Sequence, residues 1–312
     1  MYYTLCCFVT LLFTDQARAA EAPYIGLGLG SRTIALANFT EGQTVSIIAQ
    51  WPASKAYVSW FADAFDLKLL RKAPEDNTAL AGVIEDAHTR LDEISGGIAH
   101  VASLALPWEI RTERISYNAI NMLRKSSVLD PRLQEFPTLA VVETRHIVHY
   151  AYGFNRPENL GLPNDFNWHG KLAPLVLNIE CNHKYSSFQL INVHEEAALV
   201  ERSAILIDQQ KTPFKTQLTQ FLTEHITADN SAPVAQHFFN SDLRAVTFSG
   251  DAHPDVFDTL KDITGQILMD YPHAKIKDDI DPSVVFAVGA AKYAKALVDA
   301  ERLADSYGHD EL

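Results

Sequence analysis

The chain has 312 residues, a formal net charge of −13 at pH 7 and a hydrophobic content of 47%. This hydrophobic content is typical of globular proteins and excludes a disordered chain, and the length is sufficient for two domains of ordinary size. The negative charge opposes binding to phosphate backbones, so we expect no nucleic-acid partner.

The first 19 residues have the features of a secretory signal peptide. Residues 5–13 form an apolar run interrupted only by Thr10, and Ala17-Arg18-Ala19 is a cleavage site of the A-x-A type. The run is shorter than the roughly 20 apolar residues that cross a bilayer, and no other segment is long and apolar enough, so we expect no membrane span. Residues 1–4 lack the usual Lys or Arg, which leaves a buried first strand as the alternative.

Removal of this leader takes away two of the three cysteines and leaves Cys181 alone. No disulfide within the chain is then expected, although the secretory pathway is oxidising. A single cysteine is either buried and inert or a reactive thiol. Free cysteine is among the most buried residue types, which favours the first interpretation.

The periodicity of the first half predicts a β-meander followed by alternating helices and strands. The expected strands lie at residues 24–29, 33–38, 44–49, 99–106 and 139–142. The expected helices lie at residues 78–94, 116–127 and 146–152. Gly96-Gly97 is expected to end the first of these helices and Gly153 the last.

The pattern starts again after residues 154–174, which are rich in Pro, Gly and Asn and predict a linker between a first lobe at 20–153 and a second at 175–308. The expected strands of the second lobe lie at residues 175–179, 186–193, 197–200 and 243–248. Its expected helices lie at residues 215–224, 256–269 and 284–307. The repeated order predicts a duplicated α/β fold.

Two short motifs concern the secretory pathway. The last four residues, His309, Asp310, Glu311 and Leu312, match the tetrapeptide by which a receptor returns proteins to the endoplasmic reticulum. Together with the leader, they predict a resident of the reticulum lumen that binds this retrieval receptor. Asn38 begins an N-glycosylation sequon, Asn-Phe-Thr, near the end of an expected strand.

Four stretches resemble, in the same order, the nucleotide-binding domain of the 70-kDa heat-shock chaperones. Residues 24–33 are similar to the first phosphate loop of that actin-like ATPase fold, and residues 100–108 to the strand that ends in Val-Pro-Ala. Residues 143–153 resemble the helix that closes in Ala-Tyr-Gly. Residues 281–292 resemble the closing Asn-Pro-Asp-Glu-Ala-Val-Ala-Tyr-Gly-Ala-Ala and are the most specific match.

The resemblance implies a duplicated actin-like ATPase (ribonuclease-H-like) fold with two lobes around a central cleft. The chain is shorter than a full nucleotide-binding domain of the family, which implies that the outer subdomains, between residues 49 and 99 and between 208 and 242, are reduced. The resemblance places a degenerate nucleotide cleft at Gly26, Gly28, Gly30, Ser31, Asn178, Gly250 and Gly289. The adenosine loop of the family, Gly-Gly-Ser-Thr-Arg, corresponds to residues 249–253, which read Ser-Gly-Asp-Ala-His.

The residues that would hold magnesium and phosphate depart from the family. Gly28 stands where the family has Asp, and Asn178 keeps the shape of a second Asp without its charge. Glu180, Cys181 and Asn182 replace glycines of the second phosphate loop, so side chains occupy phosphate space and Glu180 adds negative charge. Phosphoryl transfer on this fold needs carboxylates for the metal and bare backbone amides for the phosphates. We therefore expect no cofactor, with ATP and magnesium as the alternative.

The altered cleft still contains groups capable of chemistry. Cys181, His183 and His253 are candidates for nucleophilic or acid–base catalysis, against the alternative of a filled, inert cleft. Their neighbours Asn178, Glu180 and Asp251 are expected to converge on the same place. His146 and His149 lie one helical turn apart, but no second pair of ligands accompanies them, so no metal site is expected.

Three functions follow, in order of preference. The first is a pseudo-ATPase of the lumen, a chaperone-like or accessory protein that binds protein clients or co-chaperones without catalysis. The second is a divergent ATP-binding protein or ATPase of chaperone type. The third is a repurposed enzyme or accessory factor acting on a small molecule or secreted peptide in the old cleft. The sequence favours the reading without enzymatic activity because the ATPase residues are not retained.

Overall fold

The computed structural model describes most of the chain and leaves out residues 1–22, residues 309–312 and several internal stretches. The signal-peptide prediction at 1–19 and the retrieval motif at 309–312 therefore lie outside the described residues. The structure describes residues 23–40, 42, 44–97, 99–126, 128–133, 140–168, 174–194, 198–206, 213–227, 238–239 and 242–308.

The first half of the chain forms a five-stranded mixed sheet in the order β3-β2-β1-β4-β5. β1, β2 and β3 form an antiparallel meander, and β4 and β5 add to it in parallel. Alternating residues of β1 and β2 lie on opposite faces, and both strands are largely buried because helices cover both faces. The strands are β1 Tyr24–Leu29, β2 Thr33–Phe39, β3 Ser46–Pro52, β4 Val101–Leu106 and β5 Val141–Glu143.

The second half repeats this arrangement. Its sheet has the order β12-β11-β6-β7-β8, which is the order of the first sheet with each strand replaced by its counterpart. β6, β7 and β8 are antiparallel, and β11 and β12 are parallel to β6. The strands are β6 Leu175–Cys181, β7 Ser186–Val193, β8 Ala198–Leu206, β11 Leu243–Ser249 and β12 Lys275–Lys277, with a separate short pair, β9 Ile226–Thr227 and β10 Phe238–Phe239.

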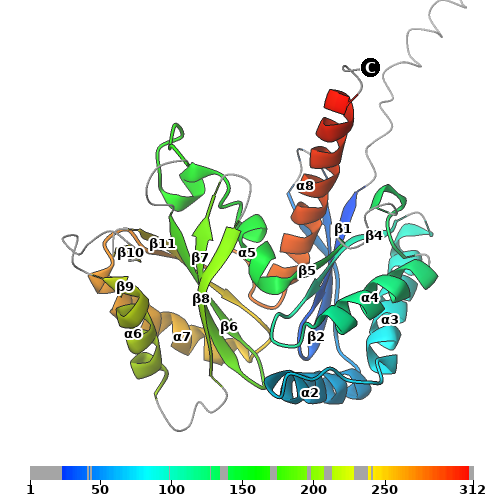
Figure 1. Ribbon diagram of the computed structural model, residues 1–312, viewed down its shortest axis with the longest axis horizontal. Coiled ribbons are helices and arrows are strands. Elements are labelled where there is room, and N and C mark those ends of the chain that lie inside the picture. Colours follow the sequence, from blue (N-terminus) through cyan, green and yellow to red (C-terminus); the bar gives the residue numbers. More distant parts are fainter. Residues whose placement is uncertain are drawn as a thin grey trace, which may run out of the picture.

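The helices form three layers around the two sheets (Figure 1). α2, α3 and α4 pack on the first sheet, α6 and α7 pack on the second, and α5 and α8 lie between the sheets. Among the described residues, no helix combines the length and apolar character needed to cross a membrane. The helices are α2 Lys55–Leu69, α3 Thr78–Ser95, α4 Glu113–Lys125, α5 Thr144–Tyr152, α6 Phe214–His225, α7 Pro254–Ile267 and α8 Val285–Gly308.

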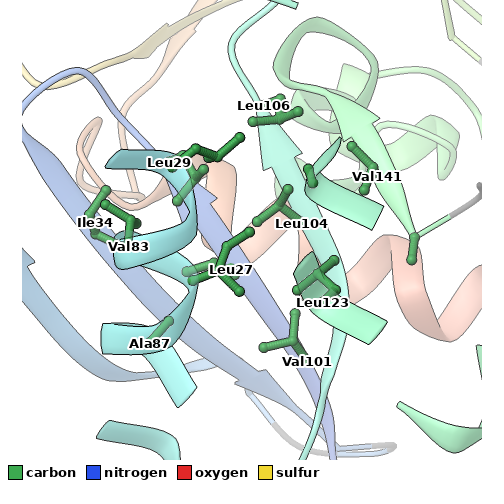
Figure 2. Packing of buried hydrophobic residues seen from close by; sticks show 14 of the residues in the cluster. Leu27, Leu29, Ile34, Val83, Ala87, Val101, Leu104, Leu106, Leu123 and Val141 are labelled. Carbon is green, nitrogen blue, oxygen red and sulfur yellow. The ribbon is translucent and has the colours of Figure 1, made fainter. Parts of the chain in front are cut away.

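Each layer has its own hydrophobic core. In Figure 2, Leu27 of β1 and Leu104 of β4 pack against Val83 of α3 and Leu123 of α4 on one face of the first sheet. The central core joins the two halves, because Ala105 of the first sheet and Val176 of the second belong to one cluster with residues of α5 and α8. Continuous apolar packing therefore connects both sheets through the central helices.

Two glycines allow β1 to lie directly against α8. A Cβ atom on Gly26 would lie 2.2 Å from the backbone nitrogen of Ala291, and one on Gly28 would lie 2.5 Å from that of Ala287. Real Cβ atoms do not approach backbone so closely, so only glycine allows this strand and helix to pack at this distance. Both glycines are therefore explained by packing.

The structure confirms the mixed α/β class and corrects the sequence analysis at one long element. No helix is predicted for residues 50–77, yet α2 occupies 15 of them. The signal was present, because the Ser54 hydroxyl accepts a hydrogen bond from the Tyr57 amide as an N-cap and buried residues recur at helical spacing. These buried residues are Tyr57, Trp60, Phe61, Ala64 and Phe65.

Several boundaries also differ from the prediction for local reasons. α4 begins at Glu113, three residues before the predicted start, because the Thr112 side chain accepts a hydrogen bond from the Ile115 amide. α7 begins at Pro254, where proline suits the first helical turn. In the predicted linker, Leu160 and Trp168 pack into the central core, so the described part of this segment is a folded connection.

Candidate functional site

Three turns from the two halves of the molecule meet at one place. Ser31 lies in the turn between β1 and β2, His183 in the turn between β6 and β7, and Asp251 in the loop between β11 and α7. The resemblance assigned these same turns to the two phosphate loops and the adenosine loop. We call Ser31, His183 and Asp251 the loop clamp, because they bond to one another across the two halves.

Asp251 is the centre of the loop clamp. Its carboxylate accepts a hydrogen bond from the Ser31 hydroxyl at 2.5 Å, from the Thr33 amide at 2.9 Å and from the Arg32 amide. Three donors from one turn of the first half thus converge on one anion of the second half. Hydrogen bonds to an ionised acceptor are about twice as strong as neutral ones, so this contact holds the two turns together.

The proton positions in the loop clamp differ from those of a hydrolytic triad. The Ser31 hydroxyl has one proton, which it donates to Asp251, so His183 Nδ1 at 2.8 Å from Ser31 Oγ donates in turn. In a serine hydrolase the histidine accepts the proton of the serine. Burial, followed by the charge of Arg32, lowers the pKa of His183, which keeps this ring neutral. The arrangement therefore holds the turns together and does not activate a nucleophile.

Helix α2 covers the turn between β6 and β7. Phe65 stacks on Tyr185 with ring centroids 4.9 Å apart, and Phe61 lies 6.3 Å from the His183 ring. Phe61 and Phe65 belong to the first half of the chain, whereas their partners His183 and Tyr185 belong to the second half. The helix thus places fully buried side chains where the two halves face one another.

A buried cluster of four polar residues lies beneath this helix. The Tyr185 hydroxyl lies 2.8 Å from Glu109 Oε2 and 2.7 Å from Glu180 Oε1, and Gln189 Nε2 lies 3.4 Å from an oxygen of each carboxyl group. Glu109 follows β4 in the first half, whereas the other three belong to β6, β7 and the turn between them. We call these four residues the acid cluster. All are at most 2% exposed.

Counting protons shows that one carboxyl group of the acid cluster is neutral. The Tyr185 hydroxyl has a single proton and two carboxyl oxygens within hydrogen-bond distance. It donates to one and must accept from the other, so the second carboxyl group is protonated. Two carboxylates that share one site cannot both ionise at ordinary pH. Glu109 and Glu180 therefore share a proton and titrate as a pair.

The electrostatic surroundings favour the same protonation. Burial raises the pKa of Glu180 well above its usual value, and the neighbouring Glu109 raises it further. Burial also raises the pKa of Glu109, against the opposing effect of the hydrogen bond from Tyr185. Burial, together with both carboxyl groups, raises the pKa of Tyr185. The positive charge of Lys68 lowers the pKa of Glu109, which opposes the effect of burial.

Asn178 belongs to a network inside the second sheet that adjoins the acid cluster through Gln189. Its amide nitrogen donates to Gln189 Oε1 at 3.2 Å and to Ser249 Oγ at 3.1 Å, and its oxygen accepts from the Thr247 hydroxyl at 3.1 Å. The side chain is completely buried. Asn178 is therefore satisfied by the two strands that flank β6, namely β7 and β11.

The remaining glycine positions of the predicted cleft contact protein backbone. A Cβ atom on Gly250, which has a φ of +105°, would lie 2.2 Å from the carbonyl oxygen of Cys181, and one on Gly289 would lie 2.5 Å from that of Ile147. At Gly30 it would lie 2.8 Å from Asp251. Each glycine thus allows a close contact between two parts of the chain.

The structure separates the three candidate catalytic residues. Cys181 is buried in the core of the second half, with its sulfur 3.0 Å from the Ser186 hydroxyl. His183 belongs to the loop clamp. His253 is the N-cap of α7, where its ring accepts a hydrogen bond from the Asp255 amide, and its side chain is 73% exposed. These three side chains do not form a common catalytic group.

The histidine pair on α5 also diverges. His146 lies at the surface, 3.7 Å from Glu143, whereas His149 is buried and burial lowers its pKa to about 3. Among the described residues, no group of three or more His, Cys, Asp or Glu side chains is arranged to hold a metal ion. Asn38 of the sequon lies near the end of β2, and its side chain accepts a hydrogen bond from Thr40 at 3.4 Å.

Sequence analysis missed three members of the acid cluster, Glu109, Tyr185 and Gln189. A signal existed for Glu109, which follows the end of β4 by three residues, because polar groups at the carboxyl ends of parallel strands often meet at one edge. Tyr185 has no comparable signal, since an aromatic residue in a turn is common. Glu180 and Asp251 were expected in the cleft, and the structure brings both to the boundary between the halves.

Comparisons with known proteins give no relative. A scan of the chain against family models finds no match, and a search of curated proteins finds none that matches significantly. Function is therefore inferred from the residues and their geometry.

Proposed function

We propose that this chain is a pseudo-ATPase: a two-lobed domain of the actin-like type that has lost nucleotide chemistry and acts as a chaperone-like or accessory binding protein. The duplicated strand order and the four ordered sequence similarities support the actin-like assignment. Each half begins with a three-stranded antiparallel meander, which is what a duplicated ribonuclease-H-like fold would require.

The loop clamp is the observation that carries this proposal. In the resembling family, the two phosphate loops and the adenosine loop face a nucleotide. Here Asp251 binds the first of these turns directly, and His183 of the second contacts Ser31. A phosphate group at this place would meet the carboxylate of Asp251, which repels a polyanion. The chain thus fills the position of the ligand with its own side chains.

A domain without nucleotide chemistry acts through its surfaces. We infer protein clients or co-chaperones as partners in the lumen of the endoplasmic reticulum, a location that the sequence features at residues 1–19 and 309–312 support. Retrieval is tested by expressing the chain with and without residues 309–312. Loss of the tetrapeptide should move the protein from the cell fraction to the medium, and equal secretion of both forms would remove the lumenal assignment.

The nucleotide part of the proposal is tested by thermal unfolding of the purified chain with ATP, ADP and magnesium. A ligand at about a hundred times its dissociation constant stabilises the folded state by about 2.7 kcal/mol, which a thermal scan resolves. We expect no change in Tm with any nucleotide. A rise in Tm that needs magnesium would instead support the divergent ATP-binding alternative.

The variant Asp251→Asn sharpens this test. It weakens the loop clamp and removes one negative charge from the position of the phosphates, while the exposed Asp255→Asn is a matched control on the same segment. If a nucleotide site exists behind the clamp, Asp251→Asn should show a nucleotide-dependent rise in Tm that the control lacks. We expect both variants to be insensitive to nucleotides.

A further inference from the structure

The carboxyl ends of β4 and β5 border a surface cavity of about 850 Å³ that is distinct from the loop clamp. We call it the Trp108 pocket. Its walls come from the end of α2, the loop between β4 and α4, the first turns of α4 and the end of β5. Ligands of open α/β sheets commonly bind outside the carboxyl ends of the strands, and the volume suits a ligand the size of a short peptide segment.

Positive charge gathers at the Trp108 pocket, although the whole chain carries a net charge of −13. Lys68, Arg111 and Arg114 line the cavity. The Lys68 ammonium lies 4.6 Å from the centre of the Trp108 ring, and the Arg145 guanidinium lies at the same distance. The two cations beside this indole ring attract negatively charged groups, such as carboxylates, to this part of the surface.

The acidic residues of the pocket only partly compensate these cations. Glu143 pairs with both Arg111 and Arg145 at 2.5 Å, so one carboxylate serves two guanidinium groups. Lys68 donates to the backbone carbonyl oxygens of Trp108 and Arg111, which are neutral acceptors. Glu113 also lines the cavity, so Glu113 and Glu143 face four cations, namely Lys68, Arg111, Arg114 and Arg145. The pocket therefore retains an excess of positive charge that an incoming carboxylate can neutralise.

The apolar part of the pocket defines a second requirement of the ligand. Tyr117 is 66% exposed at this cavity, and Ile120 and Trp108 line it next to the cations. An exposed aromatic side chain beside cations is typical of a surface that binds peptides, because aromatic and Arg residues dominate such contacts. A free inorganic anion would leave this apolar wall uncovered.

We propose that the Trp108 pocket binds a peptide segment in which an acidic residue lies next to an aromatic one. The carboxylate contacts Arg114 and Lys68, both of which line the cavity, and the aromatic side chain packs on Tyr117 and Ile120. This inference rests on the proposed role as a protein-binding domain and names the kind of client segment that it recognises.

The test uses isothermal titration calorimetry of the full chain with the blocked peptide acetyl-Gly-Glu-Phe-Glu-Gly-amide. Two matched peptides replace both Glu residues by Gln or by Lys. We expect saturable binding of the acidic peptide, weaker binding of the Gln peptide and none of the Lys peptide, and the affinity for the acidic peptide should fall as salt increases. Equal binding of all three peptides would overturn the proposal.

Two variants locate the binding site. Arg114→Gln removes an exposed cation of the pocket. It should lower the affinity for the acidic peptide about two- to fivefold, which is the effect expected for the loss of one partly exposed charge pair. Arg124→Gln removes a cation from the exposed surface of the same helix outside the pocket and should leave the affinity unchanged. Equal effects of both variants would mean that the peptide responds to general charge only.

Two further outcomes also decide against the proposal. If the acidic peptide produces no heat of binding in calorimetry and no shift of the Trp108 indole N–H signal in NMR, the pocket does not bind it. If inorganic phosphate competes fully and Tyr117→Ser has no effect on the peptide, the site binds free anions. These outcomes leave the pseudo-ATPase proposal intact, because that proposal depends on nucleotide titrations at a different site.

Discussion

Replacing Glu180 by Gln should make the protein more stable at neutral pH. In the native chain, Glu109 and Glu180 share a proton with Tyr185 between them. Gln has the shape of a protonated Glu and can donate its amide proton to Tyr185 without taking a proton from solvent. The variant therefore keeps the hydrogen bonds of the acid cluster and removes the need to hold a proton.

The pH dependence follows from the raised pKa of Glu180. Because the folded-state pKa lies above the unfolded one, this group contributes its stability below the unfolded pKa, about 4.3, and loses it as pH rises through the folded pKa. Within this window the native chain should lose up to about 1.4 kcal/mol of unfolding free energy per pH unit relative to the variant. The two proteins should be nearly equal at the acidic end of the window.

Urea unfolding at a series of pH values measures this difference. The control is Glu93→Gln, which changes an exposed Glu on α3 and should follow the native profile. Glu109→Gln should stabilise the protein as Glu180→Gln does. The double variant should gain less unfolding free energy than the sum of the two single variants, because the carboxyl groups titrate as a pair. If Glu180→Gln shows the same pH slope as the native chain, the shared-proton description of the acid cluster is wrong.

Three further predictions test the packing around this region. Asp251→Asn should lower the unfolding free energy by roughly 1–3 kcal/mol in urea, because three donors lose a charged acceptor, while the 88%-exposed Asp255→Asn should change little. Gly26→Ala should destabilise by more than about 3 kcal/mol in thermal scans, since its Cβ would overlap the α8 backbone, whereas Gly82→Ala has open space and should gain roughly 0.5–1 kcal/mol. The Cys181 thiol, 2% exposed, should react with a thiol reagent only as fast as the protein unfolds, and rapid labelling of the folded chain would contradict its burial.

Many elements of this fold could be read from local sequence. The meander of β1, β2 and β3, the helix α3 and the glycines that end α3 and α5 follow from hydrophobic period and backbone preference. These signals depend on neighbouring residues in the chain, so no tertiary information is needed. The repeated order of strands and helices likewise predicted two similar halves, which the strand orders of the two sheets bear out.

The role of α2 shows the limit of such signals. Its N-cap and its apolar spacing are local and readable, but its contact with His183 and Tyr185 of the second half is not. The sequence states that one face of this helix must be buried. Only the packing of the two halves decides which residues cover that face.

By itself, the sequence determined the α/β class, the repeated order of elements and the departure from the phosphate-binding residues of the family that it resembles, because each of these is recorded in residue types and their order. The tertiary structure decided how the altered positions are used. Glu109 and Tyr185 lie 76 residues apart, and Ser31 and Asp251 lie 220 apart. Whether such residues bond to one another depends on how two sheets pack through α5 and α8, since hydrogen bonds act only over a few ångströms.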